Sequence, residues 1–215
     1  MIYYEPSCKF KANHPEASAR IQAYLRKKGI IVTGCCRPSQ KLYTDTDTVL
    51  FNCTSCSIIV KEVHPETESM SVYEYLLKDN DFPWPDYHGE RITVQDCFRA
   101  RNDRATQEAV RQCMIRMKIV PVELADENYE KAAFDGPFLF HPIAENNMTI
   151  APAAFSRIAE HVMMFSEEEQ SELLKKQVAK YTTDRTAVYC NSCEKGISLG
   201  GGNPVHLLEL ITQDL

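Results

Sequence analysis

One stretch of the chain reads Thr48-Val49-Leu50-Phe51-Asn52-Cys53-Thr54-Ser55-Cys56, and a second reads Thr186-Ala187-Val188-Tyr189-Cys190-Asn191-Ser192-Cys193. Each begins with residues that favour a buried β-strand, and each strand runs directly into a Cys-x-x-Cys motif. A short apolar segment follows each motif, at 71–77 and at 204–210, and predicts a helix. Two copies of one pattern indicate a duplicated fold rather than a longer repeat array.

Further strand and helix patterns alternate around these two stretches. The first half has predicted strands at 2–5 and 30–33 and a helix at 14–28, and the second has strands at 91–94 and 119–124 and a helix at 106–117. Strands that alternate with helices are typical of parallel sheets. We therefore expect an α/β fold of two similar small Rossmann-like halves, a first unit of residues 1–80 and a second of 90–215, joined by the proline-containing residues between them.

The composition narrows the class of protein. The 215 residues carry a formal net charge of −6, and no run of basic residues forms the electrostatic footprint of a nucleic-acid binder. The N-terminus lacks the basic and apolar regions of a signal peptide, and no apolar run has the length of a membrane span. We therefore expect a cytoplasmic protein that binds no nucleic acid and has no membrane span.

Cysteine is abundant and its number is odd. The nine residues are Cys8, Cys35, Cys36, Cys53, Cys56, Cys97, Cys113, Cys190 and Cys193. An odd count without a secretory signal argues against a disulfide framework, and in a reducing compartment such clusters more often bind metal or carry out redox chemistry. Cys113 is different, because its helical spacing with Val110, Met114 and Met117 assigns it to the core.

Five thiols of the first half are expected to share one site. Cys8, Cys35, Cys36, Cys53 and Cys56 each follow a strand directly. The carboxyl ends of parallel strands meet at one edge of a sheet, where ligands bind. Five thiols exceed the four that a structural zinc or an ordinary cubane needs, and the side chains of adjacent cysteines diverge. The pattern therefore favours a polynuclear iron–sulfur cluster of the [4Fe–4S] type, with zinc as the open alternative.

The second half offers a smaller set of thiols. Cys97, Cys190 and Cys193 follow strands in the same way and are the predicted metal ligands there. Three thiolates with a histidine, an aspartate or a water would suit zinc, or a cluster with one open iron. His141 and His206 are the available nitrogens, although surface or packing roles are the more common ones for such residues.

Taken together, these motifs resemble the CCG cysteine-rich domain. Its pattern is a lone cysteine after the first strand, a Cys-Cys pair, and a Cys-x-x-Cys motif before a short helix. Here the lone cysteine is Cys8 in the first half and Cys97, in Gln95-Asp96-Cys97, in the second. The other matching pieces are Gly34-Cys35-Cys36, Asn52-Cys53-Thr54-Ser55-Cys56, and the tail from Cys190 to Leu210. Heterodisulfide reductase B subunits and iron–sulfur subunits of glycolate, lactate and glycerol-3-phosphate oxidation contain this domain, usually in two copies that bind a [4Fe–4S] cluster or zinc.

The sequence also departs from that pattern. Arg37 stands in the position of the glycine after the first Cys-Cys pair, and Phe134-Asp135-Gly136 stands where the second half would have Cys-Cys-Gly. The second site is therefore degenerate, and the working centre is expected in the first half. Arg99, Arg101 and Arg104 follow Cys97; they could lower its pKa or bind an anion, but a solvated loop is the favoured interpretation.

The resemblance implies an oxidoreductase, or an electron-transfer subunit of one, that acts in electron transfer or thiol/disulfide reduction. Its partners would be other redox subunits that carry flavin or iron–sulfur centres. Two alternatives remain open: a non-catalytic zinc-binding or metal-sensing module, and a metal-free dithiol reductase that works through Cys53 and Cys56. The electron donor, the acceptor and the substrate are not specified by the sequence.

Overall fold

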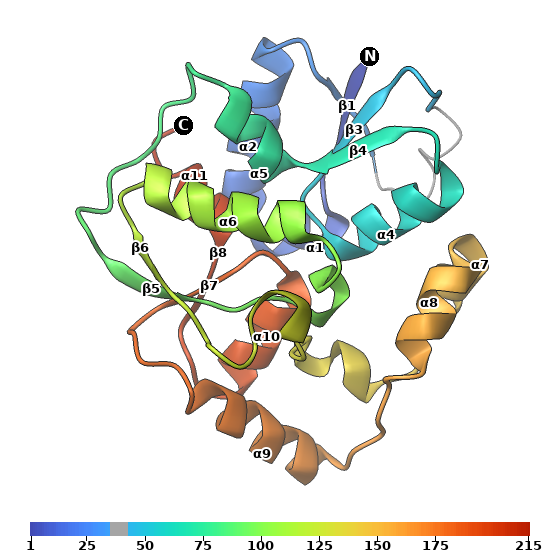
Figure 1. Ribbon diagram of the computed structural model, residues 1–215, viewed down its shortest axis with the longest axis vertical. Coiled ribbons are helices and arrows are strands. Elements are labelled where there is room, and N and C mark those ends of the chain that lie inside the picture. Colours follow the sequence, from blue (N-terminus) through green and yellow to red (C-terminus); the bar gives the residue numbers. More distant parts are fainter. Residues whose placement is uncertain (35–42) are drawn as a thin grey trace.

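The computed structural model describes residues 1–34 and 43–215. In these residues two sheets form, each of four strands that are parallel throughout (Figure 1). The first contains β1 (Ile2–Glu5), β2 (Ile31–Val32), β3 (Thr48–Phe51) and β4 (Glu68–Ser71), and the second contains β5 (Arg91–Val94), β6 (Val120–Val122), β7 (Thr186–Val188) and β8 (Pro204–His206).

The two sheets have the same topology. Their strand orders are β2-β1-β3-β4 and β6-β5-β7-β8, so each strand of the second sheet occupies the place of its counterpart in the first. This arrangement confirms the predicted α/β class with two similar Rossmann-like halves. It also places the residues that follow β1, β3, β5 and β7 at the carboxyl edges of the two sheets, where parallel sheets bind ligands.

Helices connect the strands and cover the sheets. The first half contains α1 (Cys8–Asn13), α2 (Pro15–Lys27), α4 (Thr54–Val63) and α5 (Val72–Lys78). The second contains α6 (Arg104–Arg116), α7 (Glu145–Ile150), α8 (Pro152–Ala159), α9 (Glu167–Val178), α10 (Asn191–Leu199) and α11 (Leu207–Ile211), with three short 3₁₀ turns η2 (Phe98–Ala100), η3 (Tyr129–Lys131) and η4 (Gly136–Phe140).

Local chemistry explains where several helices start. Ser71 with Glu74, and Ser166 with Glu169, form capping boxes at α5 and α9. The prediction of a helix over 204–210 is wrong at its start, because Pro204–His206 pairs with β7 as an edge strand before α11 begins. The Cys-x-x-Cys motifs themselves open α4 and α10.

The two halves share one hydrophobic core. A single cluster of buried side chains includes Tyr4, Phe10 and Leu76 from the first half and Met114 and Ile211 from the second. Helix α5 packs on α6, and α2 packs on α11. The division into units 1–80 and 90–215 stays a prediction, since this cluster continues across it. No helix in the described ranges is both long and apolar enough to cross a membrane.

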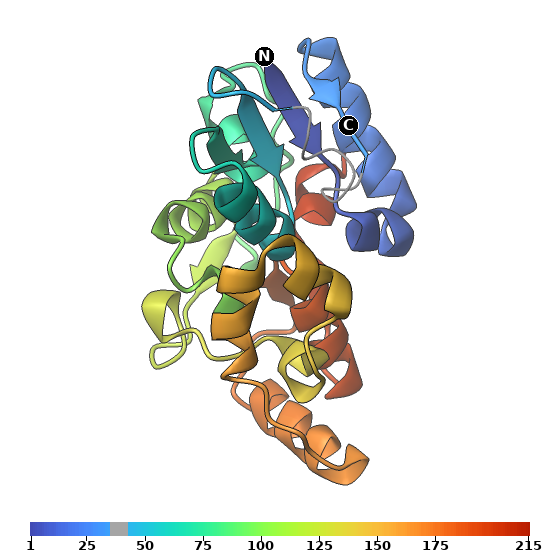
Figure 2. The same ribbon diagram turned by 90° about the vertical axis from the view of Figure 1, so that its right-hand side faces the viewer.

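An arm from the second half reaches the first. Between β6 and α9 the chain leaves its own sheet, and α8 packs on α4 (Figures 1 and 2). Phe155 and Ile158 of α8 join a second cluster of buried side chains with Phe51, Cys56 and Ile59 of the first half. The arm therefore covers the helix that carries the first Cys-x-x-Cys motif.

Candidate metal and thiol site

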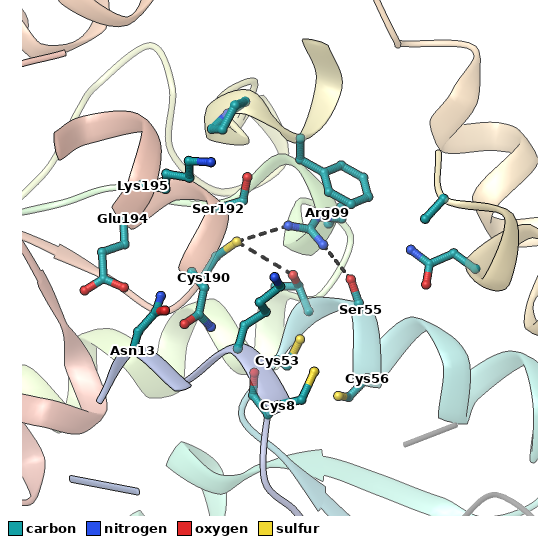
Figure 3. Close-up of a pocket in the computed structure, with 18 of the residues that line it drawn as sticks. Cys8, Asn13, Cys53, Ser55, Cys56, Arg99, Cys190, Ser192, Glu194 and Lys195 are labelled. Atoms are coloured by element: carbon teal, nitrogen blue, oxygen red, sulfur yellow. Dashed lines mark hydrogen bonds between the residues drawn. The ribbon is translucent and has the colours of Figure 1, made fainter. Parts of the chain in front are cut away.

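A cavity of about 860 Å³ lies where the two halves meet. Residues from α1, α4, η4 and α10 line it, so that its wall combines the carboxyl edges of both sheets. Four thiols, those of Cys8, Cys53, Cys56 and Cys190, belong to this lining (Figure 3). The parallel topology thus brings cysteines from distant parts of the chain to one cavity.

The two Cys-x-x-Cys motifs are held in the same way. Cys53 is the N-cap of α4, and Cys190 is the N-cap of α10, each in extended backbone conformation. Cys56 and Cys193 follow one helical turn later, on the same side of each helix. A helix N-terminus carries a partial positive charge, which favours thiolate at the cap position.

The first-half thiols differ in exposure. Cys8 is exposed, Cys53 is partly exposed and Cys56 is buried. A hydrogen bond from Cys56, with a smaller contribution from the charge of Arg99, lowers the pKa of Cys53 to about 6 although burial opposes it. Cys35 and Cys36 lie outside the described residues, so the predicted gathering of all five first-half cysteines stays a prediction.

The second-half thiols form a compact buried set with one carboxylate. The ligand atoms of Cys97, Asp135, Cys190 and Cys193 all lie within 4.8 Å of one another. The Sγ atom of Cys97 is 3.4 Å from Oδ1 of Asp135, and that of Cys190 is 3.7 Å from the same oxygen. Three sulfurs and one oxygen at these separations fit the four-coordinate shell of a zinc or iron ion.

A close backbone approach sets the position of Asp135. The next residue, Gly136, has a φ of +53°, and a Cβ there would lie 1.9 Å from the backbone oxygen of Ser192. Ser192 in turn donates a hydrogen bond of 2.6 Å to the backbone oxygen of Asp135. Only glycine permits this contact, and the contact presses the Asp135 segment against the start of α10, beside Cys190 and Cys193.

One buried arginine is paired with this set. The side chain of Arg99 is 5% exposed and that of Asp135 is fully buried. Nε and Nη2 of Arg99 donate to the two carboxylate oxygens of Asp135 at 2.7 and 2.9 Å, and Nη2 also contacts Sγ of Cys190 at 3.2 Å. The favoured expectation of a solvated loop is therefore wrong for Arg99, whereas Arg104 is exposed but begins helix α6.

Burial gives the four groups unequal proton affinities. It raises the pKa values of Cys97, Cys193 and Asp135, whereas hydrogen bonds from Cys193 and Cys97, together with the charge of Arg99, lower the pKa of Cys190. A bound divalent cation would take the place of the protons that the other groups retain. The donor types, the spacing and the paired arginine are all compatible with a metal ion at this set.

Comparison of the chain with protein-family models, with curated proteins and with solved structures gave no match. The interpretation therefore depends on the chemistry of the site itself. A buried cluster of three cysteines and one aspartate that could bind a metal ion is what the structure establishes.

The two candidate histidines lie elsewhere. His141 lines the cavity but does not belong to the buried set, and Nδ1 of His206 accepts a hydrogen bond of 3.3 Å from the backbone N–H of Leu208. The fourth ligand-type residue is instead Asp135, for which the sequence held one signal, its place in the degenerate Cys-Cys-Gly position. Arg99 carried a weaker signal, its place two residues after Cys97.

Proposed function

We propose that the protein is a metal–thiolate oxidoreductase, or an electron-transfer subunit of one, related in mode of action to the CCG cysteine-rich proteins that its motifs resemble. One observation carries the proposal: the buried set of Cys97, Asp135, Cys190 and Cys193 reaches, through Cys190, a cavity that first-half thiols also line. Redox centres are commonly held by thiolates, and the cavity gives a reactant access to them.

The two halves take different roles in this proposal. The second-half set holds a single ion, zinc or iron, through three thiolates and one carboxylate. The first-half thiols Cys8, Cys53 and Cys56, with Cys35 and Cys36, hold an iron–sulfur cluster. Such a cluster supplies one-electron chemistry when bound, and the protein tunes it through charge and solvent access. Partner subunits with flavin or iron–sulfur centres would supply or accept the electrons.

The side chains around the cavity favour an anionic reactant or thiolate. Lys9 and Lys195 line it, together with Arg99, and both motif helices direct their N-termini toward it. Phe138 and Pro137 add an apolar wall. These residues would orient a charged molecule beside the thiols and exclude part of its water.

A metal-free dithiol reductase is the second candidate. It is favoured by the placement of Cys53 and Cys190 at helix N-caps, each with a second cysteine one turn later. That arrangement activates the first thiol of a Cys-x-x-Cys pair for exchange with a disulfide. In this case the buried set would act without any metal.

Metal analysis of protein purified without oxygen tests the proposal. We expect iron with acid-labile sulfide, which Cys53→Ser removes, and one further ion per chain, which Cys190→Ser and Asp135→Asn remove. Asp135→Cys should keep that ion, since four thiolates also form a tetrahedral site. Cys113→Ala is the matched control, because its thiol is equally buried but lies outside the set.

The other outcomes separate the alternatives. Colourless protein with one zinc per chain, and no redox signal, would support the zinc module instead. Metal-free, reduced protein that reduces one equivalent of a linear disulfide such as oxidised glutathione while its own Cys-x-x-Cys pair becomes a disulfide, and loses this activity in Cys53→Ser, would support the dithiol reductase. Iron that is kept in Cys53→Ser and lost in Cys190→Ser would place the cluster in the second half.

A further inference from the structure

Arg99 contacts ligand-type residues of the second-half set and a hydroxyl in the turn that carries the first-half motif. Its Nε and Nη2 hold Asp135 in a fork, and Nη2 also reaches Cys190. The remaining nitrogen, Nη1, donates to the hydroxyl of Ser55, which belongs to the first half (Figure 3). The Cζ atom of Arg99 lies 3.8 Å from the centre of the Phe138 ring, which therefore packs against the guanidinium.

Ser55 connects the first-half motif to Arg99. It lies between Cys53 and Cys56 in the first turn of α4, the turn that presents the first-half thiols. Its neighbour Thr54 faces the second-half set, with its hydroxyl 3.9 Å from Sγ of Cys190 and 4.0 Å from Sγ of Cys97. The turn that carries the first-half motif is therefore joined to the second-half ligands through Arg99, and directly through the longer contacts of Thr54.

We propose that Arg99 is a positioning residue that couples the two thiol sets, so that a change at the first-half turn alters metal binding by Cys97, Asp135, Cys190 and Cys193. This inference rests on the proposed function. The fork would hold Asp135 and Cys190 in place as ligands of a bound ion, as partners behind metal ligands generally do. Ser55 fixes the third nitrogen and thereby the rotation of the fork.

Two physical consequences follow from this geometry. Lysine cannot replace Arg99 fully, since a single ammonium keeps the charge but cannot contact Asp135, Cys190 and Ser55 in one plane. Coupling of equilibrium affinities is also reciprocal: if metal bound by the first-half thiols changes the affinity of the second-half set, an ion in that set changes metal affinity in the first half by the same factor.

Cobalt(II) binding to the full chain, in competition with a chelator and without oxygen, provides the test. Thiolate coordination of cobalt gives charge-transfer absorption, and the part of it that Cys190→Ser removes reports on the second-half set. We expect Arg99→Lys to weaken binding by about 10- to 100-fold, the usual effect of losing a partner behind a metal ligand. Ser55→Ala, although it lies in the other half, should weaken binding by about three- to tenfold, as expected for one hydrogen bond.

The double variant decides whether the effect passes through Arg99. If it does, Ser55→Ala has no further effect in the Arg99→Lys background, and the two changes are strongly non-additive. Ser57→Ala is the matched control, because it removes a buried hydroxyl from the same helix that contacts Asp103 rather than Arg99. It should leave cobalt affinity unchanged.

The failures of the two proposals are distinguishable. Wild-type protein that binds no cobalt through thiolates overturns the proposed function and the coupling with it. Cobalt binding in which Ser55→Ala matches the control, or adds fully to Arg99→Lys, overturns the coupling alone and leaves the metal site in place.

Discussion

At the scale of single residues, Cys113 shows how environment separates one thiol from another. Its side chain is fully buried in α6, and its Sγ contacts the backbone oxygen of Tyr73 at 3.7 Å. Burial raises the pKa of this thiol, and none of the other described cysteines joins it in a group with ligand spacing. The thiol therefore belongs to the packing of α5 against α6.

We predict that Cys113→Ala leaves the metal content unchanged and lowers the free energy of unfolding by about 1 kcal/mol, because a small cavity replaces the sulfur. Metal analysis and urea denaturation of the same preparations measure both quantities. Loss of metal from a folded variant would show that this thiol belongs to the site.

At the scale of secondary structure, the start of α8 depends on another helix. Its N-cap, Ala151, has no side chain that can accept a hydrogen bond. The carboxylate of Glu62 in α4 accepts instead, from the backbone N–H groups of Ala153 at 2.8 Å and Ala154 at 2.7 Å. Helix α4 thereby holds the arm against the first half.

We predict that Glu62→Ala releases the arm locally, at a cost of about 1 kcal/mol, the typical value of a helix cap. Hydrogen exchange should accelerate across residues 145–161 while the two sheets keep their protection. Glu66→Ala is a suitable control, since Glu66 is an exposed glutamate. Equal exchange in the two variants would contradict the role of Glu62.

At the scale of the whole molecule, His14 joins the halves electrostatically. It lies between α1 and α2, and its Nε2 and Nδ1 are 2.8 and 3.3 Å from carboxylate oxygens of Glu194 in α10 and Glu209 in α11. The hydrogen bond with Glu194 and the charges of both carboxylates raise the pKa of His14, although burial opposes them. Nearby His206 stays neutral, because burial lowers its pKa to about 3.

Folding raises the pKa of His14. Protonated His14 therefore stabilises the fold fully at a pH below the pKa of histidine in the unfolded chain, where both states carry the proton. We predict that wild-type protein exceeds His14→Gln in free energy of unfolding most strongly below about pH 6.5, the ordinary pKa of histidine. The difference should shrink as the pH rises through the folded-state pKa. Denaturation of both proteins with a chelator present, from pH 6 to 9, measures it; a difference that grows with pH would refute the ion pair.

The sequence by itself determined the α/β class, the duplication, and the placement of cysteines after parallel strands. These features depend on local patterns, since a β-branched run ending in Cys53 or Cys190 predicts a strand edge without knowledge of the remaining chain. The rule that parallel strands share a carboxyl edge then brings Cys97, Cys190 and Cys193 to one place.

Only the tertiary structure decided which residues complete the site. Asp135 belongs to a segment without helical or strand periodicity, and its position depends on the contact between Gly136 and the backbone of Ser192. Arg99 reaches Ser55 across the junction of the halves. Such contacts join residues far apart in sequence and depend on how buried surfaces pack, which local propensity does not encode.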